Sequence, residues 1–192
     1  MPDKIASRNP RTGQKIKFLL CDTTKRFHSL SSDGQWTWSP IQCMGKAASH
    51  PQTMVVVRFG PLRDREVLVE LCAALKRNEH IVLALLDSKH RQLVETLERV
   101  RVDFVRFVGN VELTSDQLLK VGAQLGPVDR PRSQLAALCP FLHYDPLDVQ
   151  HELVTCGAYL DRMVLGGRRL RTICETENHL LCEYYLVPRC SA

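Results

Sequence analysis

The chain has 192 residues, of which 44% are hydrophobic and 24% are charged, a composition that excludes a mainly disordered protein. No run approaches the ~18 apolar residues that a membrane-spanning helix needs, and residues 1–4 lack the charged-then-apolar order of a signal peptide. We therefore expect a cytoplasmic protein, in which the eight cysteines are thiols, metal ligands or small core residues rather than disulfides.

Positive charge is concentrated near the N-terminus. Residues 1–50 hold eight Lys and Arg against three Asp, and the formal net charge of the whole chain is +5. A basic end allows contact with nucleic acid, but this net charge is smaller than nucleic-acid-binding domains usually carry. We expect a protein partner, and a nucleic-acid partner is an alternative that we do not favour.

Residues 1–52 are predicted to form a basic tail followed by an antiparallel β-meander. Its three strands are expected at 16–21, 27–31 and 35–38. Asp33-Gly34, between the last two, is a dipeptide preferred in two-residue hairpin turns. The stretch 39–53 contains Pro40, Gly45 and Pro51, and it has the composition of a linker.

Residues 53–127 give the clearest signals and predict a Rossmann-like α/β core within a small three-layer domain. The apolar runs 54–59, 81–86 and 102–108 are typical of strands buried on both faces. Apolar residues at helical spacing predict two helices between these strands. Because helices connect the strands, the β-α-β-α-β unit should be parallel.

Loops beyond the carboxyl ends of parallel strands usually form the ligand site of such a sheet. The chain therefore has an alternative function as a small-ligand-binding domain or enzyme, with candidate residues Gly60, Arg63, Asp87 and Asn110. It contains neither G-x-G-x-x-G nor a P-loop, so no nucleotide motif is present. For Asp87 we favour the competing interpretation, a helix cap. His80 and His90 are interpreted as ordinary surface residues.

Residues 128–192 are predicted to be a cysteine-rich metal-binding segment that combines short helices with a β-hairpin. The hairpin strands are expected at 159–165 and 168–174, with a tight turn at Gly166-Gly167 that brings Cys156 near Cys174. The last 54 positions hold five of the eight cysteines. A four-thiolate site is predicted, with ligands Cys139, Cys156, Cys174 and Cys182 and with Cys190 or His179 as substitutes.

The spacing of these cysteines favours an iron–sulfur cluster over zinc. Structural zinc sites usually contain C-x₂₋₄-C pairs, and the sequence has none. Dispersed single cysteines suit a 4Fe–4S cluster, whose size lets each ligand come from its own segment. The favoured function is a metal-binding accessory protein in which the cluster has a structural or electron-transfer role. The competing interpretation is that these cysteines fill a core as small apolar residues.

A nucleic-acid-binding module is the third possible function. Arginines near the predicted glycine turn would meet phosphates, and aromatic residues of the predicted meander would stack on bases. These residues are Arg162, Arg168, Arg169 and Arg171, together with Phe27, Trp36 and Trp38. For the tryptophans we favour the alternative of packing within strands.

Overall fold

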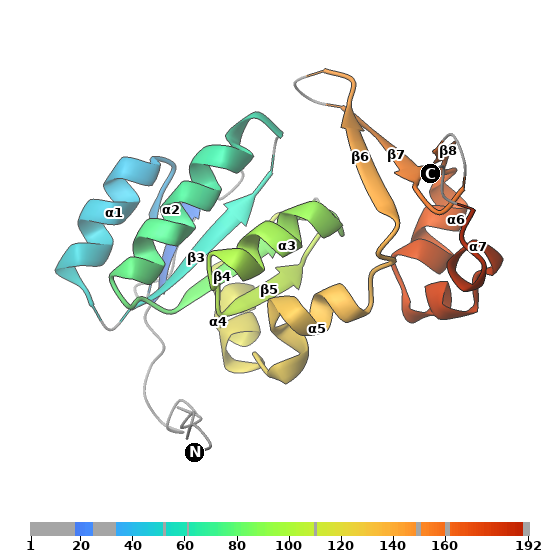
Figure 1. Cartoon of the computed structure of the whole chain (residues 1–192). Helices are drawn as coiled ribbons and strands as arrows, with labels where there is room; N and C mark the ends of the chain where they lie inside the picture. Colours follow the sequence, from blue (N-terminus) through green and yellow to red (C-terminus); the bar gives the residue numbers. More distant parts are fainter. Residues whose placement is uncertain are drawn as a thin grey trace, which may run out of the picture.

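The computed structural model describes residues 18–24, 34–51, 53–60, 62–109, 111–148, 151–159 and 162–189, and the side chain of Arg63 lies outside this description. Within these ranges the chain forms a five-stranded sheet and a separate three-stranded sheet (Figure 1). None of the helices in these ranges is both long and apolar enough to cross a membrane.

The larger sheet is parallel throughout, with the strand order β2-β1-β3-β4-β5. Its strands are β1 (Phe18–Asp22), β2 (Gly34–Thr37), β3 (Met54–Phe59), β4 (Val82–Leu86) and β5 (Phe104–Phe107). The helices that accompany it are α1 (Pro40–Ser49), α2 (Arg65–Arg77), α3 (Arg91–Arg99), α4 (Ser115–Ala123) and α5 (Pro131–Ala136). The predicted core is β3-α2-β4-α3-β5, and the α/β class is confirmed.

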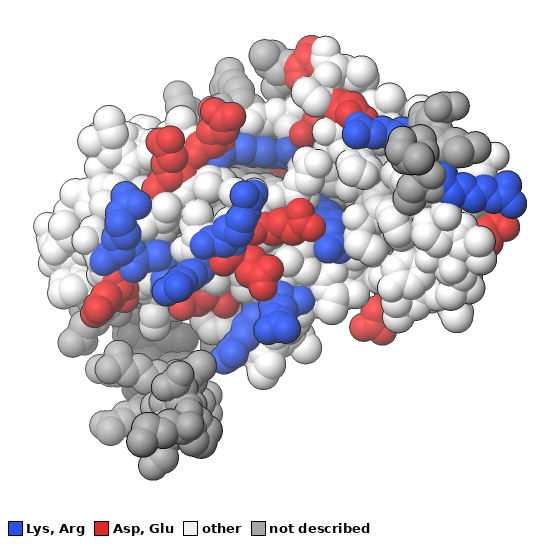
Figure 2. Space-filling model, in the orientation of Figure 1, with Lys and Arg blue, Asp and Glu red and all other residues white. Residues whose placement is uncertain are grey.

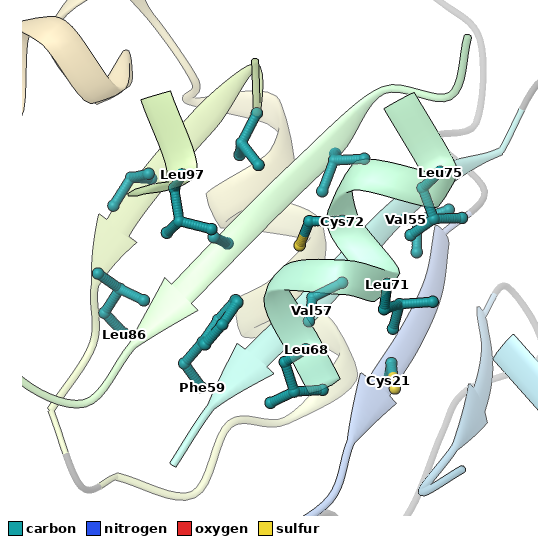
Figure 3. Packing of buried hydrophobic residues seen from close by; sticks show 14 of the residues in the cluster. Cys21, Val55, Val57, Phe59, Leu68, Leu71, Cys72, Leu75, Leu86 and Leu97 are labelled. Carbon is teal, nitrogen blue, oxygen red and sulfur yellow. The ribbon is translucent and has the colours of Figure 1, made fainter. Parts of the chain in front are cut away.

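Helices cover both faces of this sheet, as a three-layer domain requires. Figure 1 shows α1, α2 and α3 over one face and α4 behind the other. Alternate residues of β3 enter opposite cores: Val55 and Val57 pack beneath α1–α3, whereas Val56 packs with Leu118 of α4. Figure 3 shows the first core, where α2 places Leu71 against the strands. Burial on both faces explains why the strands are continuous apolar runs.

The predicted antiparallel meander is wrong. β1 and β2 are parallel, with Phe18 opposite Gly34, and the predicted strand 27–31 lies outside the described residues. The predicted linker contains α1, whose N-cap Ser39 accepts a hydrogen bond from the Gln42 amide. Pro40 stands in the first turn, where proline favours a helix start. Because α1 carries the chain from β2 across to β3, the strands can be parallel.

The C-terminal third forms a small antiparallel sheet followed by short helical turns. Its strands, in the order β6-β7-β8, are β6 (Leu142–Pro146), β7 (Glu152–Cys156) and β8 (Met163–Val164). The turns after it are α6 (Gly167–Arg169), a π-helical turn (Leu170–Cys174), a 3₁₀ turn (Glu177–Leu181) and α7 (Glu183–Leu186).

The predicted hairpin at Gly166-Gly167 is also wrong. Gly166 is the N-cap of α6 and has a φ of −68°, so the chain enters a helix there instead of reversing. Leu170, Ile173 and Cys174 follow at helical spacing and pack in one apolar cluster. This periodicity outweighs the turn preference of the two glycines.

Arg58 of β3 is a charged residue sealed inside the large sheet, with only 1% of its surface exposed. Its Nη2 donates to Asp87 Oδ1 at 3.2 Å and to the Val111 carbonyl oxygen at 2.8 Å. Its Nη1 lies 3.9 Å from Asp22 Oδ2. The guanidinium thus connects the ends of β1 and β4 with the segment between β5 and α4. A charge buried this deeply is tolerated because it is paired.

Replacing Arg58 should therefore destabilise the fold strongly. The variant Arg58→Met leaves the buried carboxylate of Asp22 without the guanidinium and removes the contacts of Arg58 with Asp87 and Val111, and we expect the free energy of unfolding to fall by about 3–5 kcal/mol. Urea denaturation measures this change. The control is Arg162→Met, which removes an exposed pair with Asp145 and should cost less than about 1 kcal/mol. Equal losses in the two variants would contradict the structural role of Arg58.

Candidate metal centre

Three of the four predicted ligands lie in one apolar cluster of the C-terminal third. Cys139, Cys156 and Cys174 are 6%, 6% and 4% exposed, and they share this cluster with Leu142 and Leu165. They come from separate places: the loop after α5, the end of β7 and the end of the π-helical turn. The fold therefore brings together thiols that are distant in the sequence.

Backbone hydrogen bonds fix the segments that carry these cysteines. The Cys139 amide donates to the Cys174 carbonyl oxygen at 2.8 Å, which joins the first segment directly to the third. Cys156 pairs with Leu142 across the β6–β7 ladder. The Leu142 amide in turn donates to the Cys139 carbonyl oxygen at 3.3 Å, so the second segment is tied to the first.

Cys182, the fourth predicted ligand, lies at the more exposed edge of this group. It is half-buried and precedes α7. The Arg169 guanidinium donates from Nη2 to its Sγ at 3.6 Å. Burial disfavours the thiolate of Cys182, but the hydrogen bonds from Arg169 and from the amides of Tyr185 and Tyr184 outweigh burial and lower its pKa below the ordinary value.

The four thiols interact electrostatically. Burial raises the pKa of Cys174, the thiols of Cys139, Cys156 and Cys182 add to this effect in that order, and together they bring the pKa to about 12. Burial also raises the pKa of Cys139, to which the thiols of Cys156 and Cys182 contribute. Like charges close together disfavour ionisation, so four thiolates here would repel one another unless a cation lay among them.

A single metal ion does not match the arrangement of these side chains. Among the residues that the structure describes, no three His, Cys, Asp or Glu side chains are positioned to hold one ion. A tetrahedral four-thiolate zinc site would need sulfur atoms about 3.8 Å apart, given a Zn–S distance of about 2.3 Å. A four-iron cluster holds its thiolates farther apart because each binds a different iron.

His179, one of the two predicted substitute ligands, is buried in the cysteine-rich segment. His179 is 3% exposed, and its Nδ1 lies 2.7 Å from the Thr176 carbonyl oxygen. A carbonyl can only accept, so Nδ1 carries the proton, and Nε2 of the neutral ring is the nitrogen that could bind a metal. The ring packs edge-on to Tyr185 within the cysteine-rich segment. Cys190 lies outside the described residues.

The predicted ligand residues at the sheet edge are only partly described. Gly60 follows β3, and a side chain there would collide with the methyl group of Thr24, so glycine allows the loops after β1 and β3 to approach closely. Asp87 does not cap α3, whose N-cap is His90; it binds Arg58 instead. Asn110 and the side chain of Arg63 lie outside the described residues.

Arg58 and Asp22, which connect this edge to the core, were missed by sequence reasoning. The available signal was a charged residue inside an apolar strand: Arg58 interrupts the run 54–59, and Asp22 ends the run that begins at Phe18. Lys, Arg, Asp and Glu are almost never fully buried unless they are paired. A charge in each of two neighbouring apolar strands therefore indicates a buried ion pair.

His90 helps to join the cysteine-rich segment to the large sheet, and the prediction that it lies on the surface is wrong. It is 5% exposed and stacks on Tyr144 of β6 with ring centroids 3.7 Å apart. Its Nδ1 accepts from the Leu93 amide, so Nε2 carries the proton and donates to Glu152 of β7 at 3.2 Å. Arg65 of α2 also binds Glu152, at 2.8 Å. The same prediction fails for His80, which is 3% exposed.

The pairing of His90 predicts a loss of stability in mild acid. Burial and the charge of Arg65 lower the pKa of His90 below the ordinary 6.5, and they outweigh the opposing effect of Glu152. Because His90 has the lower pKa in the folded state, the unfolded chain binds its proton more tightly. The contribution of neutral His90 to the stability of the fold is therefore complete above about pH 6.5 and is lost as pH falls through the folded-state pKa.

Chemical denaturation at pH 7.5 and pH 5.0 checks this prediction against the variant His90→Asn, in which asparagine keeps an N-cap but cannot titrate. The wild-type protein should lose more stability between these two pH values than the variant does. An equal loss in both would show that His90 does not contribute to the acid sensitivity.

The large sheet belongs to the doubly wound α/β class, with the strand order 2-1-3-4-5. The order reverses between β1 and β3, because β2 lies on one side of β1 and all later strands lie on the other. No protein-family model, curated protein or solved structure matches the chain. Its function is therefore inferred from the geometry of its own residues.

Proposed function

We propose that this chain is a metal-binding accessory protein that holds a 4Fe–4S cluster through Cys139, Cys156, Cys174 and Cys182. The observation that supports this proposal is the convergence of four thiols from four separate segments. Iron–sulfur clusters are held by four cysteine thiolates. Zinc is the alternative metal for the same ligands, and it would require their sulfur atoms to move closer together than the described structure places them.

The small size of the elements around these cysteines also supports a bound metal. β8 has two residues, α6 has three and α7 has four, so none of them can bury much apolar surface. Segments of this size usually need a disulfide or a metal to hold them together. The described cysteines are all free thiols, which leaves metal ligation as the available cross-link.

The unequal exposure of the four thiols suggests an electron-transfer role as well as a structural one. Cys139, Cys156 and Cys174 are buried, whereas Cys182 is half-buried and gives the group an edge near solvent. Leu181, which precedes Cys182, and Val187, which follows α7, are 82% and 68% exposed. Exposed apolar residues of this kind favour contact with a protein partner. Free thiols favour a reducing compartment, and we propose the cytoplasm.

Anaerobic purification followed by metal analysis tests the proposal. We expect a brown protein with absorbance at about 400 nm and iron and sulfide in equal amounts, because a four-iron cluster contains as many sulfides as irons. Serine at each of the four cysteines should reduce bound iron at least about tenfold, as loss of a ligand weakens binding. Stoichiometric zinc without iron would favour the alternative metal, and a colourless protein without either metal would rule out the function.

Cys72→Ala serves as the matched control. Cys72 is buried in the core beneath α1–α3, among residues of the large sheet and its helices. Its replacement should leave the iron content unchanged. Loss of iron in this variant would mean that general destabilisation, and not ligand removal, explains the serine variants.

A second candidate function is ligand binding at the edge of the large sheet. The carboxyl ends of β1 and β3 lie side by side at the point where the strand order reverses, which is where doubly wound sheets bind ligands. Gly60 lies in this region and Asp87 follows the neighbouring strand β4. Thr23 Oγ1 donates to Asp64 Oδ2 at 2.9 Å, which joins the loops after β1 and β3.

A thermal-shift panel of nucleotides and phosphorylated metabolites addresses this second function. A compound present at 100 times its dissociation constant should add about 2.7 kcal/mol of stability, which raises the melting temperature by several degrees. Gly60→Val, which would push Thr24 aside, should remove the response. A panel without any shift would exclude these two ligand classes.

We do not propose nucleic-acid binding. Trp36 of β2 packs against the core next to α4, as strand packing predicts. The prediction is wrong for Trp38, which lies after the strand and is 49% exposed, with its ring edge-on to that of Trp36 at a centroid distance of 4.3 Å. On the face drawn in Figure 2, basic and acidic side chains lie beside one another over much of the surface. A continuous basic surface is the usual mark of nucleic-acid binding.

A further inference from the structure

Arg169 of α6 makes close contacts around Cys182. Its Nη2 lies 3.6 Å from Cys182 Sγ, and its guanidinium carbon lies 4.9 Å from the centre of the Tyr184 ring. A third contact joins Nη2 to Glu183 Oε1 at 3.8 Å. The Tyr184 ring and the Glu183 carboxylate both contact the guanidinium, so its position beside the sulfur is defined by more than one interaction.

The neighbouring arginine has the same charge but a different environment. Arg168 is exposed, whereas Arg169 is half-buried between α6 and α7. The two residues belong to the same short helix. They therefore separate the effect of a contact with Cys182 from the effect of a positive charge nearby.

A hydrogen bond to a ligand sulfur has a known consequence in iron–sulfur proteins. Reduction adds one electron, and therefore one negative charge, to the cluster and its four thiolates. A cation and an N–H donor beside a sulfur stabilise the reduced form more than the oxidised form. Hydrogen bonds to the sulfurs and solvent exposure are among the factors that set the potential of such clusters.

We propose that Arg169 is a positioning residue of the cysteine centre, which holds Cys182 by an N–H···S hydrogen bond and raises the reduction potential of the bound cluster. This inference rests on the proposed function. Arg169 does not ligate the metal and acts through Cys182 alone.

The first test is the reduction potential of the loaded protein, measured by anaerobic titration with dithionite and redox dyes. At a fixed potential, the ratio of reduced to oxidised cluster should fall about tenfold in Arg169→Met, which corresponds to about 59 mV for a one-electron couple. Arg169→Lys keeps the charge but lacks the planar fork, so its ratio should lie between those of Arg169→Met and the wild type. Arg168→Met should change the ratio less than about threefold. Equal shifts in Arg168→Met and Arg169→Met would overturn the proposal.

The second test uses metal-free protein and does not depend on the cluster. Iodoacetamide labelling at pH 7.5, followed by peptide mass spectrometry, measures how fast Cys182 reacts. Arg169→Met should slow the labelling of Cys182 at least about threefold, because the thiolate is the reactive form and loses its donor. Arg168→Met should label at the wild-type rate. An unchanged rate in Arg169→Met would show that the contact does not control the sulfur.

The two tests separate the failure of this inference from the failure of the proposed function. If the protein takes up no metal, the proposed cluster and the effect of Arg169 on its potential are both disproved. If Arg169→Met still slows the labelling of Cys182 in that case, the contact between Arg169 and Cys182 is supported on its own. If the protein binds iron but neither its reduction potential nor the labelling rate of Cys182 changes in Arg169→Met, the role of Arg169 is disproved and the proposed cluster is still supported. Circular dichroism of each variant checks the fold, and Arg169→Lys replaces Arg169→Met if the latter is unfolded.

Discussion

The large sheet depends on one buried cation. Arg58 lies inside the face of β3 that packs against α4, and its charge is balanced by Asp22 from one neighbouring strand and by Asp87 after the other. An uncompensated charge at this depth would cost several kcal/mol. The observed alignment places Asp22 of β1 opposite Arg58 and brings the end of β4 beside it, so the ion pairs favour this register and this order of strands.

The parallel core could be predicted because its signal is local and strong. A strand covered by helices on both faces is apolar at nearly every position, as β4 is throughout and β3 is except at Arg58. The helix between them shows apolar residues at helical spacing. The two predicted hairpins that are wrong both came from glycine-containing dipeptides. Gly34 begins a strand and Gly166 caps a helix, because the elements on either side decide how a flexible residue is used.

The candidate metal centre was predicted in its composition but not in its surroundings. Clustering of cysteines in the last third predicted Cys139, Cys156, Cys174 and Cys182 as ligands, and the structure places the first three in one apolar cluster and leaves Cys182 more exposed. The predicted hairpin that would bring Cys156 near Cys174 is wrong, since β7 pairs with β6 and not with a strand after Gly167. The role of Arg169 could not be predicted, because it depends on how α6 and α7 meet.

The order of the partners of Arg58 along the chain has a consequence for synthesis on the ribosome. Asp22 precedes Arg58, but Asp87 follows it by 29 residues and Val111 by 53. While the chain grows, β3 therefore carries a cation whose remaining partners have not yet been made. We therefore do not expect the strands to fold one after another from the N-terminus. We expect the first five strands to fold together once the loop before α4 has left the ribosome.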